Sequence, residues 1–117
     1  MANAERGEVS FEASGKTWTM KIGTNAMCEL EETTGKSIAE IGKLLVDPTT
    51  ATVTLMRRVF MTALLEHQEG ISLKQAGDII DDLGIGVAGQ KLGEAFQAAL
   101  PKAKEGGSRP PKAPTAG

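Results

Sequence analysis

The alternation of apolar and polar residues near the start of this chain constrains its fold more than any other feature. Apolar residues occupy every second position in two runs within residues 8–22, and Ser14-Gly15 lies in the break between the runs. A period of two is typical of strands with one buried face, and a glycine in the break suits a tight turn. The pattern predicts a β-hairpin whose register is fixed by burial of that face. A two-residue turn sets two apolar pairs across the strands, Phe11 with Trp18 and Val9 with Met20.

After the hairpin, the spacing of apolar residues changes to three and four, which is typical of amphipathic helices. Thr24 or Asn25 is expected to cap the first helix, and Gly35 suits its left-handed end. A second helix is expected to follow a capping box at Ser37–Glu40 and to end at Asp47-Pro48. Two short helices in succession therefore follow the hairpin.

The third helix is expected to start near Thr50 to Thr52 and to run to about Gln68, where Gly70 stops it. Its apolar residues form one stripe, yet further large apolar residues lie well outside that stripe. A helix that is apolar on most sides is normally central to a fold or faces a partner. The stripe comprises Val53, Met56, Phe60 and Leu64, and the residues outside it are Leu55, Val59, Met61 and Leu65.

A second capping box, at Ser72–Gln75, marks the clearest helix start in the chain, with Ile71 placed to pack against the first turn. This fourth helix is expected to end at Gly84. A weaker last helix over residues 87–100 is loosened by two glycines and stopped by Pro101.

These segments predict an α+β, mainly α fold, in which an N-terminal β-hairpin packs on about four short helices. We expect Phe11, Trp18 and Phe60 to share its core. Residues 1–100 form a single small domain in this interpretation, because a chain of 117 residues suffices for one core. Residues 101–117 are rich in Pro, Gly, Lys and Ala and hold no large apolar residue, so we expect a disordered tail.

Charge distinguishes the tail from the domain. The whole chain has a net charge of −2 and the tail +3, which leaves −5 for the first hundred residues. Phosphate contacts need clustered positive charge, so a nucleic-acid partner is not expected. A basic surface formed by Arg57-Arg58, Lys74 and Lys91 stays open as an alternative, which corresponds to a small DNA-associated regulator.

Two glycine motifs have the spacing of nucleotide-binding loops without the context that such loops need. Gly84–Gly89 matches the dinucleotide fingerprint but follows a helix rather than a strand. Ser14–Thr17 resembles the end of a phosphate-binding loop, but Ser10 stands where the first glycine belongs. We interpret the first motif as a flexible helix–helix connection and the second as a hairpin turn, and no cofactor is expected.

Side chains with catalytic or metal-binding potential are few and scattered. His67 has no second His or Cys at ligand spacing, and Cys28 is interpreted as a buried or inert thiol. Asp78, Asp81 and Asp82 share one helix and are interpreted as a solvated acidic face, with an electrostatic docking surface as the alternative. No catalytic, cofactor-binding or metal-binding residue is therefore predicted, and the protein is not expected to be an enzyme.

No apolar stretch approaches the length of a membrane span, and the polar first residues lack the apolar segment of a secretory signal. A single cysteine also fits a reducing compartment. These observations predict a soluble cytoplasmic protein without a membrane partner.

Four segments, Ser14–Trp18, Cys28–Ile38, Thr62–Leu65 and Ser72–Ile80, carry a family resemblance over roughly residues 8–100. The strongest part is Leu30–Ile38, with its Leu-Glu, its Thr-Gly and a Ser followed by an apolar residue. In these segments the chain resembles the small tail-assembly proteins of gene transfer agents and related tailed phages of bacteria. It departs from that family near the end of the third helix, where Met61 and Ala63 replace an aromatic residue and a glycine.

The resemblance implies a non-catalytic, chaperone-like tail assembly protein that binds the tape-measure protein or tail-tube components in the cytoplasm of a bacterial host. A structural subunit of the tail tube or of its junctions is the alternative, and such a subunit is virion-associated. The resemblance supplies no catalytic residues and assigns no contact surface. We expect binding through apolar helix surface and the edge of the hairpin, and homo-oligomerisation stays open.

Overall fold

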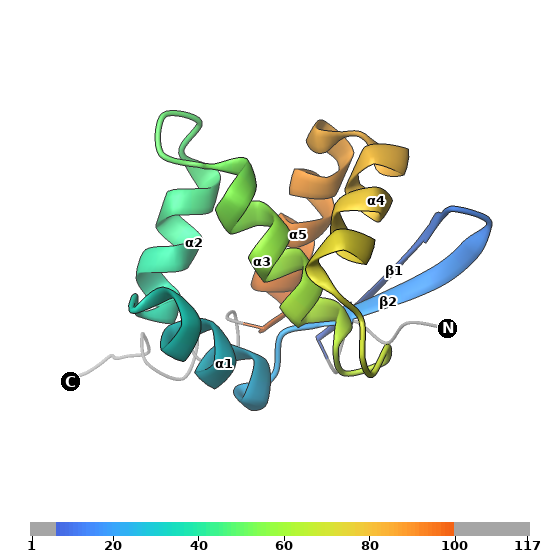
Figure 1. Cartoon of the computed structure of the whole chain (residues 1–117). Coiled ribbons are helices and arrows are strands. Elements are labelled where there is room, and N and C mark those ends of the chain that lie inside the picture. Colours follow the sequence, from blue (N-terminus) through green and yellow to red (C-terminus); the bar gives the residue numbers. More distant parts are fainter. Residues whose placement is uncertain (1–6, 100–117) are drawn as a thin grey trace, which may run out of the picture.

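The computed structural model describes residues 7–99, which form a β-hairpin and five helices (Figure 1). The predicted α+β, mainly α class is confirmed, and the five helices correspond to the four clearer helical segments and the weaker last one of the sequence. The predicted disordered tail at residues 101–117 lies outside the described residues. The elements are β1 (Glu8–Ala13), β2 (Lys16–Lys21), α1 (Thr24–Thr34), α2 (Ile38–Val46), α3 (Val53–Leu64), α4 (Leu73–Leu83) and α5 (Ile85–Ala99).

The hairpin has the register that its alternation predicts. Ser14 and Gly15 connect the strands with φ angles of 52° and 74°. Positive φ at both positions is the requirement of the tight turn whose twist matches that of paired strands. The Ser14 backbone N–H also donates to Asp82 Oδ2 at 2.8 Å, which ties the turn to the end of α4. The predicted cross-strand pairs are confirmed: Phe11 lies opposite Trp18 and Val9 opposite Met20.

The apolar face of the hairpin packs on the helices, as predicted. Phe11, Trp18 and Phe60 are all buried in one core. The rings of Phe11 and Phe60 lie 5.6 Å apart and are tilted by 54°, a favourable aromatic geometry. The Trp18 indole N–H donates to the Ala13 carbonyl oxygen at 2.9 Å, so its burial leaves no polar group unpaired.

Most helix ends follow the predicted capping chemistry. Gly35 ends α1 at φ 71°, and Ser37 Oγ accepts from the Glu40 backbone N–H at the start of α2. The capping box of Ser72 and Gln75 is complete at the start of α4. The prediction for the start of α1 is wrong, because neither Thr24 nor Asn25 is its N-cap. Gly23 holds that position in an extended conformation, with no side-chain cap.

Helix α3 ends at Leu64 rather than near Gln68, which corrects the predicted boundary. The Leu65 N–H donates to the Thr62 carbonyl and the His67 N–H donates to the Leu64 carbonyl. These bonds span three residues instead of four, so the chain tightens into turns before it reaches Gly70. The apolar spacing continues beyond Leu64, and for this reason the sequence pattern overestimates the length of the helix.

The region between α4 and α5 also differs from its prediction. Gly84 alone separates the two helices, and α5 begins at Ile85 rather than near Val87. The Ala88 N–H already donates to the Gly84 carbonyl at 2.9 Å. The expected flexible connection over residues 84–89 is therefore wrong, because Gly86 and Gly89 belong to a regular helix.

Helix α3 occupies the centre of the molecule, as its apolar sequence predicts (Figure 1). It lies between the hairpin and α4 on one side and α2 on the other, with α5 behind it. Seven of its twelve residues are buried, whereas α2 buries only Ile41. Helix α2 therefore covers one side of the core while most of its own apolar side chains stay partly accessible.

Candidate functional site

The titratable side chains singled out from the sequence, such as His67 and Cys28, lie apart from one another and do not form a shared site. His67 Nε2 lies 3.1 Å from Glu8 Oε2, a contact that links the loop after α3 to β1. Cys28 is exposed on α1, so of the two interpretations of this residue, a buried or an inert thiol, the buried one is wrong. Within residues 7–99 no group of three or more His, Cys, Asp or Glu side chains gathers to hold a metal ion.

The charged residues on α4 also have local partners. Asp78 Oδ2 accepts from Lys74 Nζ at 3.2 Å, and Asp82 accepts from the hairpin turn at 2.8 Å. The predicted acidic face is exposed at Asp78, Asp81 and Asp82. Part of this face therefore stabilises the attachment of the hairpin.

No helix among the described residues combines the length and the apolar character that crossing a membrane requires.

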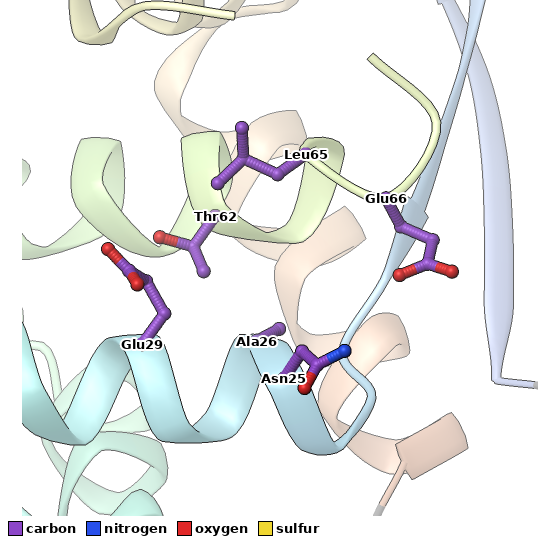
Figure 2. Close-up of a pocket in the computed structure, with 6 residues that line it drawn as sticks. All are labelled: Asn25, Ala26, Glu29, Thr62, Leu65 and Glu66. Carbon is purple, nitrogen blue, oxygen red and sulfur yellow. The ribbon is translucent and has the colours of Figure 1, made fainter. Parts of the chain in front are cut away.

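A small pocket lies between α1 and the end of α3, and Figure 2 shows the residues that line it. Its volume is about 200 Å³, below the roughly 300 to 1,000 Å³ of typical small-molecule sites. The Thr62 hydroxyl beside it already donates to the Arg58 carbonyl at 2.8 Å. The pocket is too small for a typical ligand. Its lining residues are Asn25, Ala26, Glu29, Thr62, Leu65 and Glu66.

A much larger groove lies between α2 and α5, with a residue of α3 at its base. Its volume is about 1160 Å³, above the roughly 300 to 1,000 Å³ of typical small-molecule sites. Buried Leu92 and Phe96 contribute from α5, and Met56 contributes from α3. We name it the α2–α5 groove. It is lined by Ile38, Ala39, Gly42, Lys43, Leu45, Val46, Met56, Gly89, Gln90, Leu92, Gly93, Glu94, Phe96 and Gln97.

Three glycines shape the walls of the α2–α5 groove. At Gly42 a Cβ atom would lie 3.8 Å from the Phe96 ring, so α2 comes within van der Waals reach of α5 there. At Gly89 a Cβ atom would meet Met56 Cε at 3.6 Å. At Gly93 a Cβ atom would meet nothing within 4 Å. The groove is therefore filled beside Gly42 and open beside Gly93, where a side chain of a partner has room to enter.

Exposed apolar side chains gather at the end of the helical bundle where α2 ends and where α3 and α5 begin. The last residue of α2 and the first residues of α3 and α5 lie at the same end of the helical bundle (Figure 1). All the large apolar residues that are exposed among the described residues belong to these helix ends. The most exposed, at 77%, is Val46, which also lines the groove. The four residues are Val46, Val53, Ile85 and Val87.

The charges at the groove are few and lie on opposite walls. Glu94 on α5 lies 3.8 Å from Lys91 of its own helix. Lys43 on α2 forms no ion pair with any residue in the range 7–99. The turn after α2 is fixed by Asp47, whose pKa is lowered by hydrogen bonds from the Thr49 backbone N–H and then from the Thr49 hydroxyl. The groove thus offers apolar contact and one unpaired cation.

No protein-family model, curated protein or solved structure matches this chain significantly. The assignment of a site therefore rests on geometry, and the α2–α5 groove is the larger and more apolar of the two concavities described above. Sequence reasoning did not find it. The available signal was the placement of Ile85, Gly89, Gly93 and Phe96 on one face of a single helix.

Proposed function

We propose that this protein is a non-catalytic, chaperone-like tail assembly protein of a phage or gene transfer agent, and that it holds a tape-measure or tail-tube component during assembly. The observation that carries the proposal is the α2–α5 groove, whose lining includes the exposed Val46 at the end of the bundle where the other exposed apolar helix ends also lie. Exposed apolar surface that adjoins a groove is typical of protein–protein interaction sites.

The size and chemistry of the groove favour a protein segment over a small substrate. Apolar residues dominate its lining, and its two charged residues, Lys43 and Glu94, do not form a nucleophile with an adjacent base. Binding of apolar side chains is therefore the chemistry that this groove supports best. Acid–base catalysis would need paired titratable groups around a common point.

The sequence resemblance supplies the class of partner, and its strongest segment contributes to the groove. Residues 30–38 form the corner between α1 and α2, in which Leu30 is buried and Gly35 adopts the left-handed conformation. Ser37 then caps α2, one wall of the groove. The end of this segment, at Ser37 and Ile38, thus positions the α2 wall of the candidate site.

The proposal is tested by pull-down of the full chain from cells that are making tails. We expect recovery of the tape-measure or tail-tube protein, and loss of that recovery in Gly93→Leu, whose side chain fills the groove. Glu32→Leu adds the same side chain to an exposed position of α1 outside the groove and is expected to leave recovery unchanged. Recovery of neither component, together with normal particles formed without this chain, contradicts the proposal.

Mass spectrometry of purified particles distinguishes the chaperone from the structural alternative. A chaperone is expected to be absent from finished particles, whereas a subunit of the tail tube or its junctions is retained. Salt-sensitive binding to duplex DNA would instead support the regulator alternative, because phosphate contacts release counterions. The acidic balance of the first hundred residues argues against that outcome.

A further inference from the structure

We infer that the α2–α5 groove receives an amphipathic helix of a second protein, with carboxylates beside its apolar stripe on the side that faces α2. The inference rests on the proposed function and names the kind of segment that the groove binds. It follows from four observations: the walls of the groove, its length, its charges and the surfaces that this chain could itself place in it.

The walls of the groove favour a helical occupant. Both walls are α-helices, whose backbone groups are hydrogen-bonded within the helix. An extended segment would therefore bury its own N–H and C=O groups without the sheet edge that normally pairs them. A helix satisfies these groups internally and presents only side chains to the groove.

The length of the groove also fits a helix. It follows α2 over residues 38–46 and α5 over residues 89–97. At about 1.5 Å per residue, each wall is about 12 Å long, or roughly two helical turns. Two turns hold the apolar anchors of an amphipathic helix, which recur at spacings of three and four. The open space at Gly93 is the position at which one such anchor enters.

The charges of the groove specify the flanks of the incoming helix. Lys43 stands on the α2 wall without an ion pair among the described residues, whereas Glu94 on the α5 wall has Lys91 nearby. Lys43 on the α2 wall is thus the cation of the groove lining that has no carboxylate partner among the described residues. A partner with Asp or Glu beside its apolar stripe complements Lys43, and a partner with Lys there is repelled.

This chain does not itself supply a suitable occupant. Residues 101–117 hold no large apolar side chain and carry a net charge of +3, the same sign as Lys43. A second copy offers its exposed large apolar residues only at the helix ends around the groove, within the described residues. The accessible apolar side chains of α2 mostly belong to the groove wall itself. Neither source therefore provides a separate exposed apolar stripe along a helix, and we assign the groove to a different protein.

Two synthetic peptides of about 18 residues test the inference, a length at which an isolated helix becomes viable. Both carry leucines at spacings of three and four, and they differ only in the residues that flank this stripe, which are Glu in one and Lys in the other. Binding to the full-length protein is measured by fluorescence anisotropy. We expect the Glu peptide to bind about threefold to fivefold more tightly than the Lys peptide, because Lys43 is exposed to solvent.

Three variants locate the binding and its charge dependence. Lys43→Glu is expected to reverse the preference between the two peptides, because it changes only the sign of the charge on the α2 wall. Gly93→Leu is expected to abolish binding of both peptides, and Glu32→Leu to leave both affinities unchanged. Thermal unfolding of each variant shows that loss of binding is not loss of folding.

Absence of binding by both peptides to the folded protein overturns the helix assignment, and equal affinities overturn the charge assignment. Oligomerisation of the protein that is lost in Gly93→Leu would assign the groove to a second copy and also overturn the inference. These outcomes are independent of the proposed function, because that proposal is tested with tail components in cells. A tape-measure protein recovered through an extended segment would support the function and contradict the helix.

Discussion

Helix α3 is covered on its two sides to very different degrees. Toward the hairpin, Phe60 contacts Phe11 and has no exposed surface, and Trp18 is buried in the same core. Toward α2 and α5, Met56 lies at the base of a groove of about 1160 Å³. The side of α3 that faces the hairpin is fully packed. The side that faces α2 and α5 borders a concavity that solvent or a partner must fill.

This difference in packing assigns different roles to the two sides of α3: the hairpin side stabilises the fold, and the groove side is available for binding. Burial of apolar side chains supplies most of the free energy of folding, and such burial is concentrated between the hairpin, α3, α4 and the inner face of α5. Helix α2 has four large apolar residues besides Ile41, but none of these four is buried. We therefore expect substitutions on the hairpin side to lower stability, and substitutions in the groove to lower binding with little effect on stability.

The largest expected effect is that of Phe60→Ala, which creates a cavity between α3 and the hairpin. The free energy of unfolding should fall by about 3 to 5 kcal/mol. Leu45→Ala in the half-buried wall of the groove should cost only about 1 kcal/mol, because less apolar area is removed from contact. Urea denaturation of both variants measures the contrast, and equal losses would show that the two sides of α3 do not differ.

Glycine-to-alanine substitutions should have opposite signs at two positions. Gly35 ends α1 at φ 71°, so Gly35→Ala should lower stability by about 1 to 2 kcal/mol. Gly93 lies in the interior of α5 with open space around it, so Gly93→Ala should raise stability by about 0.5 to 1 kcal/mol. Thermal unfolding of the two variants checks the signs. A loss of stability at Gly93 would mean that the groove has no room there.

Ser72→Ala removes the capping box that starts α4. The hydroxyl accepts from the Gln75 N–H at 3.1 Å, and its loss should lower stability by about 1 kcal/mol. Helix α4 packs on α3, so the loss should appear in global unfolding rather than in local fraying. Ser72→Asp keeps an acceptor at the N-cap and should retain most of the stability. A full loss in that variant would assign the effect to something other than capping.

The smallest expected effect on stability is that of Val46→Ser at the mouth of the groove. Because the side chain is 77% exposed, the free energy of unfolding should change by less than about 0.5 kcal/mol. Affinity for the Glu peptide should nevertheless fall, since Val46 lines the groove. Calorimetry and anisotropy measure the two quantities separately. A marked loss of stability without loss of affinity would place Val46 in the folding core instead.

Local chemistry made much of the fold predictable from the sequence. The register of the hairpin follows from the turn at Ser14-Gly15, and the start of α4 follows from Ser72 and Gln75, because these residues act on neighbours in the chain. The end of α3 did not follow, because apolar spacing continues past Leu64 while the backbone already forms turns.

The groove was not predictable from the same signals. Its walls come from α2 and α5, which are far apart in the sequence and meet only through tertiary contacts such as that of Phe96 beside Gly42. The glycines of α5 suggested a loose connection, because helix propensity alone disfavours them. In the folded protein Gly89 lies in a helix against Met56, and packing outweighs that local preference.

Amide hydrogen exchange of the full chain, with and without saturating Glu peptide, tests most directly whether the open side of α3 is the recognition side. We predict slower exchange in residues 38–46 and 89–97, which form the groove walls, and no change in the hairpin or in residues 57–64. Slower exchange confined to the hairpin, with α2 and α5 unaffected, would contradict the account and assign recognition to the strand edge.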